Sequence, residues 1–135
     1  MIKFKHLQLP AEFEGDLTVN DCPLNPKLQA MVFALNDFAE YFFGKSITIT
    51  EILRDQETQD KYYAGNAKYA EKPWKSVHQF GCGVDVRAAG FSDDEIEEMI
   101  AFLSGAFDYG DDKHDVVVIH DVGLGKHIHL QVKPG

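Results

Sequence analysis

The sequence predicts one α+β domain over residues 1–135, in which helices pack on an antiparallel β-sheet. A length of 135 residues is typical of a single domain. Apolar residues make up 44% of the chain, the usual share in a globular protein with its own core. Helical and strand patterns segregate along the chain instead of alternating strictly, and this favours α+β over α/β.

The first long helix is predicted over residues 25–44. Asn25 can cap its amino end, Pro26 suits its first turn, and Gly44 can end it. Apolar residues recur at intervals of three and four and so share one face: Leu28, Met31, Val32, Leu35, Phe38, Ala39 and Phe42. Residues 46–53 follow with alternating β-branched side chains and are expected to form a strand.

The remaining elements are predicted from weaker or shorter patterns. Residues 55–64 are expected to form a short polar helix, and residues 64–75 an irregular loop interrupted by Gly65, Asn66 and Pro73. A second long helix is predicted over residues 91–107, because Ser92 and Glu95 have the spacing of a capping box. Its buried stripe would contain Ile96, Met99, Ile100, Leu103 and Phe107. Residues 115–132 are expected to form two strands joined by a glycine-containing turn.

Charge and hydropathy argue against several classes of function. A formal net charge of -9 is unsuited to nucleic acid or an anionic membrane surface, both of which attract clustered Lys and Arg. No apolar run approaches the roughly 20 residues of a membrane span. The first ten residues lack the pattern of a signal peptide, so synthesis in the cytoplasm is expected. Cys22 and Cys82 form no C-x-x-C pair, and free thiols are expected in place of a disulfide or a cysteine zinc site.

Two stretches combine histidines with a carboxylate in a way that suits a metal site. In "KHIHLQV", strand alternation places His127 and His129 on one face, opposite an apolar face. In "SVHQFGCGVDV", two glycines separate His78 from Asp85 and would let the backbone turn sharply. Two imidazoles and one carboxylate, with a fourth position open, describe a catalytic zinc site. The alternative is a tight turn with a capping aspartate and a hydrogen-bonded histidine.

Residues 76–85 resemble the S-x-H-x-x-G-x-A-x-D motif of the zinc D-Ala-D-Ala metallopeptidases. This group contains D-alanyl-D-alanine carboxypeptidases, vancomycin-resistance dipeptidases and phage L-alanyl-D-glutamate endolysin peptidases, and the hedgehog signalling domain shares the fold. "ITEILRDQETQ" resembles the family's strand that ends in an arginine before a helix with a glutamine. "KHIHLQV" resembles its final strand, so the similar blocks follow the family order over residues 47–132.

The resemblance implies that His78, Asp85 and His129 bind Zn²⁺, with His127 as the alternative third ligand. It implies that Arg54 binds a substrate oxygen, and that Ser76 supports the site by hydrogen bonding. The substrate would be a peptidoglycan stem peptide or cross-link with D-residues. Such an enzyme would reach the cell wall through phage lysis machinery or on a virion.

Two positions depart from the family. Gly83 stands where alanine is usual, which is expected to be a mild change. Many members have an E-x-x-H sequence that ends at the last histidine, and its glutamate is the general base. Here Lys126 lies three residues before His129, and Leu124 lies three residues before His127.

Some members end in H-x-H, so His127 is expected to take the acid–base role. Asp121, or a carboxylate from elsewhere in the chain, is the second candidate. The alternative function is a non-catalytic zinc-binding module of the same fold, structural or cell-wall-binding. A third possibility is an α+β protein with no tight metal.

Overall fold

The computed structural model describes residues 1–121 and 125–134. Five strands form one sheet in the order β1-β2-β3-β5-β4. Their bounds are β1 Lys3–Phe4, β2 Thr48–Glu51, β3 Gly83–Arg87, β4 Val117–Asp121 and β5 Lys126–Gln131. Neighbours are antiparallel except β1 and β2, which are parallel. The α+β class is confirmed, but the sheet is mixed, because two helices connect β1 to β2 as a crossover.

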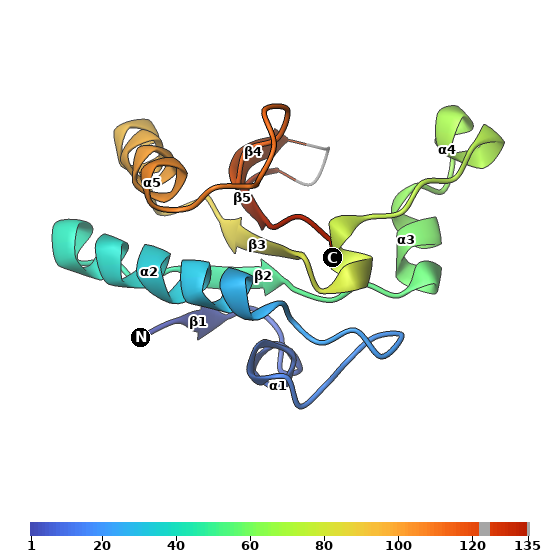
Figure 1. Cartoon of the computed structure of the whole chain (residues 1–135), viewed down its shortest axis with the longest axis horizontal. Helices are drawn as coiled ribbons and strands as arrows, with labels where there is room; N and C mark the ends of the chain where they lie inside the picture. Colours follow the sequence, from blue (N-terminus) through green and yellow to red (C-terminus); the bar gives the residue numbers. More distant parts are fainter. Residues whose placement is uncertain (122–124, 135) are drawn as a thin grey trace.

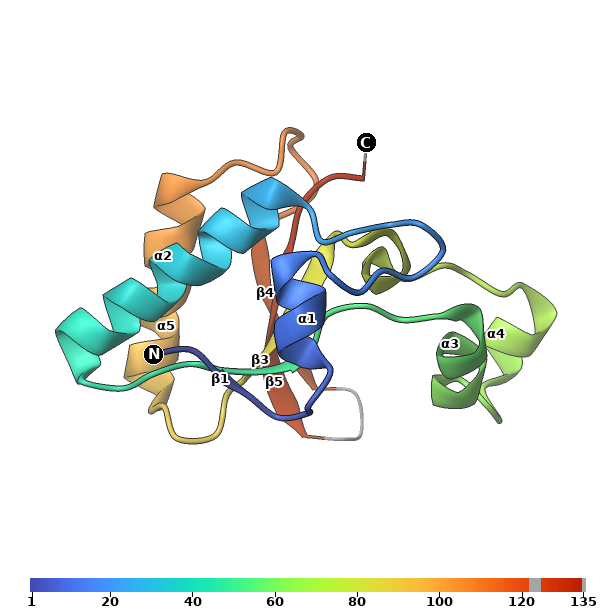
Figure 2. The same ribbon diagram turned by 90° about the horizontal axis from the view of Figure 1, so that it is seen from below.

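Five α-helices and one 3-10 helix complete the described chain. They are α1 Leu9–Glu14, α2 Pro26–Phe43, α3 Gln56–Tyr62, α4 Ala67–Glu71, η1 Val77–Phe80 and α5 Asp93–Ala106. The long helices α2 and α5 lie together on one side of the strands, and α3 and α4 lie on the other (Figures 1 and 2). None of the described helices is long and apolar enough to cross a membrane.

The ends of the long helices follow their predicted caps. The Asn25 side chain accepts a hydrogen bond from Lys27 N at 2.9 Å, and Gly44 ends α2 with a φ of 65°. Ser92 begins α5 with the predicted capping box. Phe42 is an exception on the predicted apolar face, since it is 63% exposed near the end of the helix.

Three parts of the chain differ from the expectations. The loop predicted over residues 64–75 contains α4, because Asn66 caps a helix by accepting a hydrogen bond from Tyr69 N at 3.0 Å. The short elements β1 and α1 have no counterpart among the predictions. The predicted glycine-containing turn of the hairpin falls on residues 122–124, which lie outside the described residues.

The core lies between the sheet and the helices α2 and α5. Fully buried strand residues face these helices, and they include Ile49, Val84, Val86, Ile128 and Leu130. Because strand side chains alternate, the residues between them face the opposite side of the sheet. That opposite face therefore carries Asp85 from β3 and the two histidines of β5.

An irregularity in β2 brings one more side chain to this opposite face. Ile49 pairs with Val86 and Glu51 pairs with Asp85, so the register shifts between Ile49 and Glu51. A bulge of this kind changes the phase of the alternation. Ile49 and Ile52 are both fully buried although they are three residues apart. Glu51 consequently faces away from the core, toward Asp85.

Candidate metal centre

Three buried side chains from three elements meet on the face of the sheet opposite the core. His78 comes from η1, Asp85 from β3 and His129 from β5, and each is at most 7% exposed. Asp85 and His129 are direct neighbours in the antiparallel register. One potential ligand atom from each lies within 4.8 Å of the others. This group, the His78–Asp85–His129 triad, could hold a metal ion.

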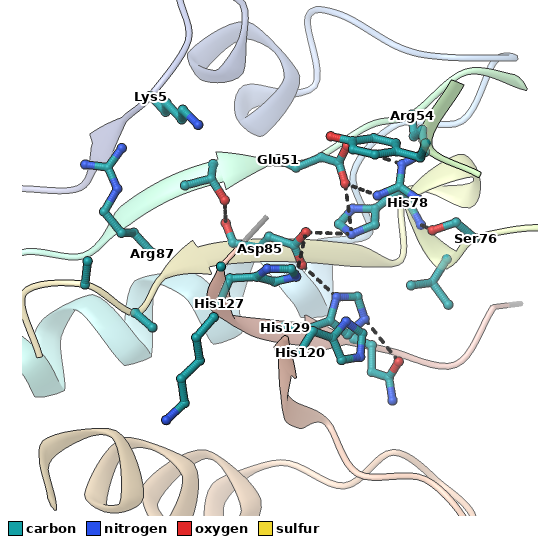
Figure 3. Close-up of a pocket in the computed structure, with 18 of the residues that line it drawn as sticks. Lys5, Glu51, Arg54, Ser76, His78, Asp85, Arg87, His120, His127 and His129 are labelled. Atoms are coloured by element: carbon teal, nitrogen blue, oxygen red, sulfur yellow. Dashed lines mark hydrogen bonds and ion pairs between the residues drawn. The ribbon is translucent and has the colours of Figure 1, made fainter. Parts of the chain in front are cut away.

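Both histidines direct a nitrogen at the Asp85 carboxylate. His129 Nδ1 lies 2.8 Å from Asp85 Oδ1, and His78 Nε2 lies 3.3 Å from Asp85 Oδ2 (Figure 3). The two imidazole rings stand at 67° to each other with their centroids 5.2 Å apart. The potential ligand atoms therefore approach a common point from different directions.

In each neutral ring, the nitrogen that points away from Asp85 carries the hydrogen and donates it. The nitrogen that points toward Asp85 then keeps its lone pair, with which it can bind a metal. His78 Nδ1 lies 2.9 Å from the carbonyl oxygen of Ile52, which can only accept, so Nδ1 carries the hydrogen. His129 Nε2 lies 3.2 Å from Gln131 Oε1, and Gln131 Nε2 donates to the carbonyl oxygen of Asp115 at 2.8 Å. Gln131 thus presents its oxygen to His129. Outer contacts of this kind fix ring orientation and tautomer at metal sites.

The electrostatics of the triad favour positive charge between its members. Burial by itself disfavours a charged imidazole, but the charge and hydrogen bond of Asp85, with the charge of Glu51, raise the pKa of His78 above its ordinary value. Burial also disfavours an ionised Asp85, yet the charge of His78 and hydrogen bonds from both histidines hold the pKa of Asp85 far below its usual range. Three acceptor atoms around one point require a cation there, either protons or a metal ion.

The two glycines of the motif are required for close packing. Gly81 has a φ of 70°, and a Cβ there would lie 2.0 Å from the carbonyl oxygen of Pro23. A Cβ on Gly83 would lie 2.7 Å from Val77 Cγ2, and 3.2 and 3.3 Å from the Cε1 atoms of His129 and His78. An alanine at position 83 would therefore crowd Val77 and both imidazoles.

Ser76 lies where the motif places a supporting residue. Its hydroxyl accepts a hydrogen bond from His78 N at 3.2 Å, and Gln79 Oε1 accepts one from Ser76 N at 2.9 Å. Ser76 and Gln79 also form the capping box that begins η1. The serine thereby fixes the short helix that carries His78.

Arg54 lies beside the triad but is engaged by protein groups. Its guanidinium forms an ion pair with Glu51, donates to Gln59 Oε1 at 2.7 Å, and lies 4.5 Å from the centroid of the Tyr62 ring. Glu51 in turn places Oε1 3.4 Å from His78 Nε2. No motif in the sequence points to Glu51. The spacing of three between the buried residues Ile49 and Ile52, instead of two, does mark the bulge that brings Glu51 here.

His127, the other histidine of β5, also faces Asp85. His127 Nε2 lies 3.5 Å from Asp85 Oδ2, farther than His129, and its side chain is 21% exposed. His120, which no motif indicates, stacks on His129 with ring centroids 4.6 Å apart. Burial and the charges of His129 and His127 lower the pKa of His120. Asp121 follows His120 on β4 and alternates away from this face, so it does not approach the triad.

The triad opens into a cleft of about 1170 Å³. The aromatic side chains Tyr62, Tyr63 and Trp74 line one part of it, next to Arg54. His127, His120 and Arg87 line another part. The cleft is large enough for several residues of an extended peptide.

No family model, curated protein or solved structure matches this chain. The similarity to the zinc D-Ala-D-Ala metallopeptidases therefore remains a prediction from the motif. The geometry of the triad stands independently of it.

Proposed function

We propose that this protein is a zinc-dependent metallopeptidase that hydrolyses peptidoglycan stem peptides or cross-links. The observation that carries the proposal is the convergence of three acceptor atoms, from His78, Asp85 and His129, in an open cleft. Catalytic zinc sites use three such nitrogen and oxygen ligands and leave a fourth position open. The choice of peptidoglycan, through a D-Ala-D-Ala carboxypeptidase or L-Ala-D-Glu endopeptidase activity, rests on the motif of residues 76–85.

Zinc is the proposed ion because of the chemistry of these donors. Magnesium and calcium prefer oxygen ligands, whereas two of the three atoms here are imidazole nitrogens. A zinc ion bound here would polarise a substrate carbonyl and lower the pKa of water. His78 and His129 would be held in their binding tautomers by Ile52 and Gln131.

The residues around the triad would move the proton. His127 Nε2 faces the cleft near Asp85 and could take a proton from water and deliver it to the leaving amine. Glu51 is the second candidate, because its carboxylate lies beside His78 at the edge of the same cleft. Arg54 would stabilise developing oxygen charge or, through its ion pair, hold Glu51 in place.

Paired substitutions separate the two proton acceptors. His127→Gln is expected to keep zinc and to lose about 100-fold or more in kcat, the usual effect of removing a general base. Glu51→Gln is expected to have a smaller effect on kcat at unchanged zinc content. A larger loss in Glu51→Gln than in His127→Gln would give the role to Glu51.

The proposed activity is tested by mass spectrometry of muropeptides. Purified peptidoglycan is incubated with zinc-loaded wild type, with Asp85→Ala and with the wild type plus EDTA. Wild type is expected to create one new free amine at a defined bond, and the other two samples none. Zinc-loaded protein that releases no new amine from peptidoglycan of several cross-link types would contradict the proposal. Delivery by phage lysis machinery or on a virion is the proposed route to this substrate.

A zinc-binding module without catalysis is the second candidate function. It is favoured by Lys126, which occupies the position of the family's usual glutamate and directs its Nζ to Asp93 Oδ1 at 3.5 Å. One zinc per chain that Asp85→Ala loses, together with unchanged muropeptides, would support this module in place of the peptidase.

A further inference from the structure

The cleft differs in charge from the rest of the protein. The whole chain has 22 acidic and 13 basic residues. Among the described residues that line the cleft, six are Lys or Arg and three are Asp or Glu. The basic six are Lys5, Arg54, Lys61, Lys75, Arg87 and Lys126. An acidic protein that concentrates cations in one cleft is suited to a ligand that carries negative charge there.

Four of these six cations are already engaged by protein groups. Arg54 pairs with Glu51, Lys61 lies 3.3 Å from Glu57, and Lys126 lies 3.5 Å from Asp93. Lys75 donates to the side chain of Gln56. Within residues 1–121 and 125–134, Lys5 and Arg87 are the two cleft cations whose side chains contact no carboxylate or amide. A ligand can reach these two cations without displacing a carboxylate or amide partner.

Lys5 and Arg87 lie on the same side of the triad, opposite Arg54. In Figure 3 both cations lie on one side of Asp85 and His127, and Arg54 and Ser76 lie on the other. Arg87 is two residues after Asp85 on β3 and pairs with His127 in the register, so it projects from the face that carries the triad. Lys5 directly follows β1, at the far edge of the same sheet.

We propose that Arg87 and Lys5 form an anion subsite that binds a substrate carboxylate one or two residues from the carbonyl held at the triad. Two residues along a strand span about 7 Å, and an extended peptide advances about 3.3–3.6 Å per residue. A carboxylate at that separation reaches the Arg87 guanidinium, whose planar fork suits a carboxylate. The substrate class is thus a peptide with an anionic group close to the bond. This assignment rests on the proposed peptidase function for the role of the triad, but the binding itself can be measured without metal or turnover.

The binding test uses NMR on the metal-free full chain, because a bound metal would itself attract a carboxylate. The chain has two arginines, so two side-chain Nε–H signals report on Arg54 and Arg87 separately. N-acetyl-D-alanine is expected to shift the Arg87 signal and to leave the Arg54 signal in place. The neutral analogue N-acetyl-D-alaninamide is expected to shift neither.

Variants establish which side chains bind the anion. Arg87→Gln and Lys5→Gln are each expected to weaken binding of N-acetyl-D-alanine up to about tenfold, the lower end of the range for a hydrogen bond between charged groups. Lys113→Gln is the matched control, because Lys113 is exposed and does not line the cleft. Equal shifts with acid and amide, a shift of Arg54 alone, or wild-type affinity in Arg87→Gln would each overturn the subsite.

Activity measurements then keep this inference distinct from the proposed function. With zinc-loaded protein, Arg87→Gln is expected to raise KM for a D-Ala-D-Ala peptide acid about tenfold and to leave its C-terminal amide unchanged. Cleavage with no acid preference in either protein would refute the subsite and leave the peptidase intact. Acid-selective binding by a protein that cleaves nothing would retain the subsite and refute the peptidase.

Discussion

Removing the amide of Gln131 is expected to weaken zinc binding without touching a proposed ligand. Gln131 Oε1 lies 3.2 Å from His129 Nε2, and its amide nitrogen is fixed by the carbonyl oxygen of Asp115. In Gln131→Ala the His129 ring loses the acceptor that orients it. Its tautomer is then no longer set for binding through Nδ1.

The size of this effect follows from the geometry. Loss of an outer hydrogen bond at a metal site usually costs 10–100-fold in affinity. The lower end is expected here, because the 3.2 Å contact joins two neutral groups and Gln131 is only half-buried, so water can partly replace it. The zinc Kd should therefore rise about tenfold, which equals about 1.4 kcal/mol.

Competition with a chromophoric chelator measures this change in Kd. Gln131→Glu keeps an acceptor oxygen for His129 and should bind zinc at least as tightly as the wild type. Gln8→Ala serves as a surface control, since Gln8 is exposed and its side chain makes no capping hydrogen bond. A wild-type zinc Kd in Gln131→Ala would refute the reasoning. An equal rise in Kd in Gln131→Ala and Gln131→Glu would assign the effect to the contact with Asp115.

Four further outcomes are expected. Since the folded pKa of His78 is raised and that of Asp85 is lowered, the metal-free protein should be most stable between about pH 4 and 6.5 and its Tm should fall toward pH 8. Zinc displaces protons from its ligands, so the rise in Tm on adding zinc should be larger at pH 8 than at pH 6, and the reverse would contradict a triad that binds metal. Gly83→Ala crowds Val77 and both imidazoles, and it should lose about 1–3 kcal/mol of stability in denaturant unfolding together with zinc affinity; unchanged values would show that the site relaxes freely. Burial raises the pKa of Glu12, whose carboxylate accepts a hydrogen bond from the backbone N–H of Leu53 just after β2. Its contribution to stability is therefore fullest below about pH 4.5 and is lost as the pH rises. Glu12→Gln should therefore raise Tm at pH 7 more than at pH 4, and an equal shift at both would contradict this.

Local signals in the sequence were sufficient for the long elements. Asn25, Gly44 and the Ser92 capping box act within one turn of the chain, so the ends of α2 and α5 could be predicted. The strand alternation of "KHIHLQV" likewise placed His129 on the face that meets Asp85. The motif indicated that His78 meets these two residues, but only the fold places the three side chains next to one another.

The parts that could not be predicted depend on tertiary contacts or on ambiguous residues. Asn is common both in loops and at helix caps. The packing of Tyr69 against Trp74 stabilises α4, in which Asn66 is the cap. The two-residue strand β1 exists only because β2 offers it a partner. Glu51 reaches His78 through a bulge, and a register shift depends on the neighbouring strand as well as on β2 itself.

Crystals of the zinc-loaded protein, measured on both sides of the zinc absorption edge, test the central claim most directly. One anomalous peak is expected within about 2.0–2.2 Å of His78 Nε2, an Asp85 carboxylate oxygen and His129 Nδ1. A peak at any other group of side chains, or three unaltered side chains with no peak between them, would contradict the assignment of this triad as a metal centre.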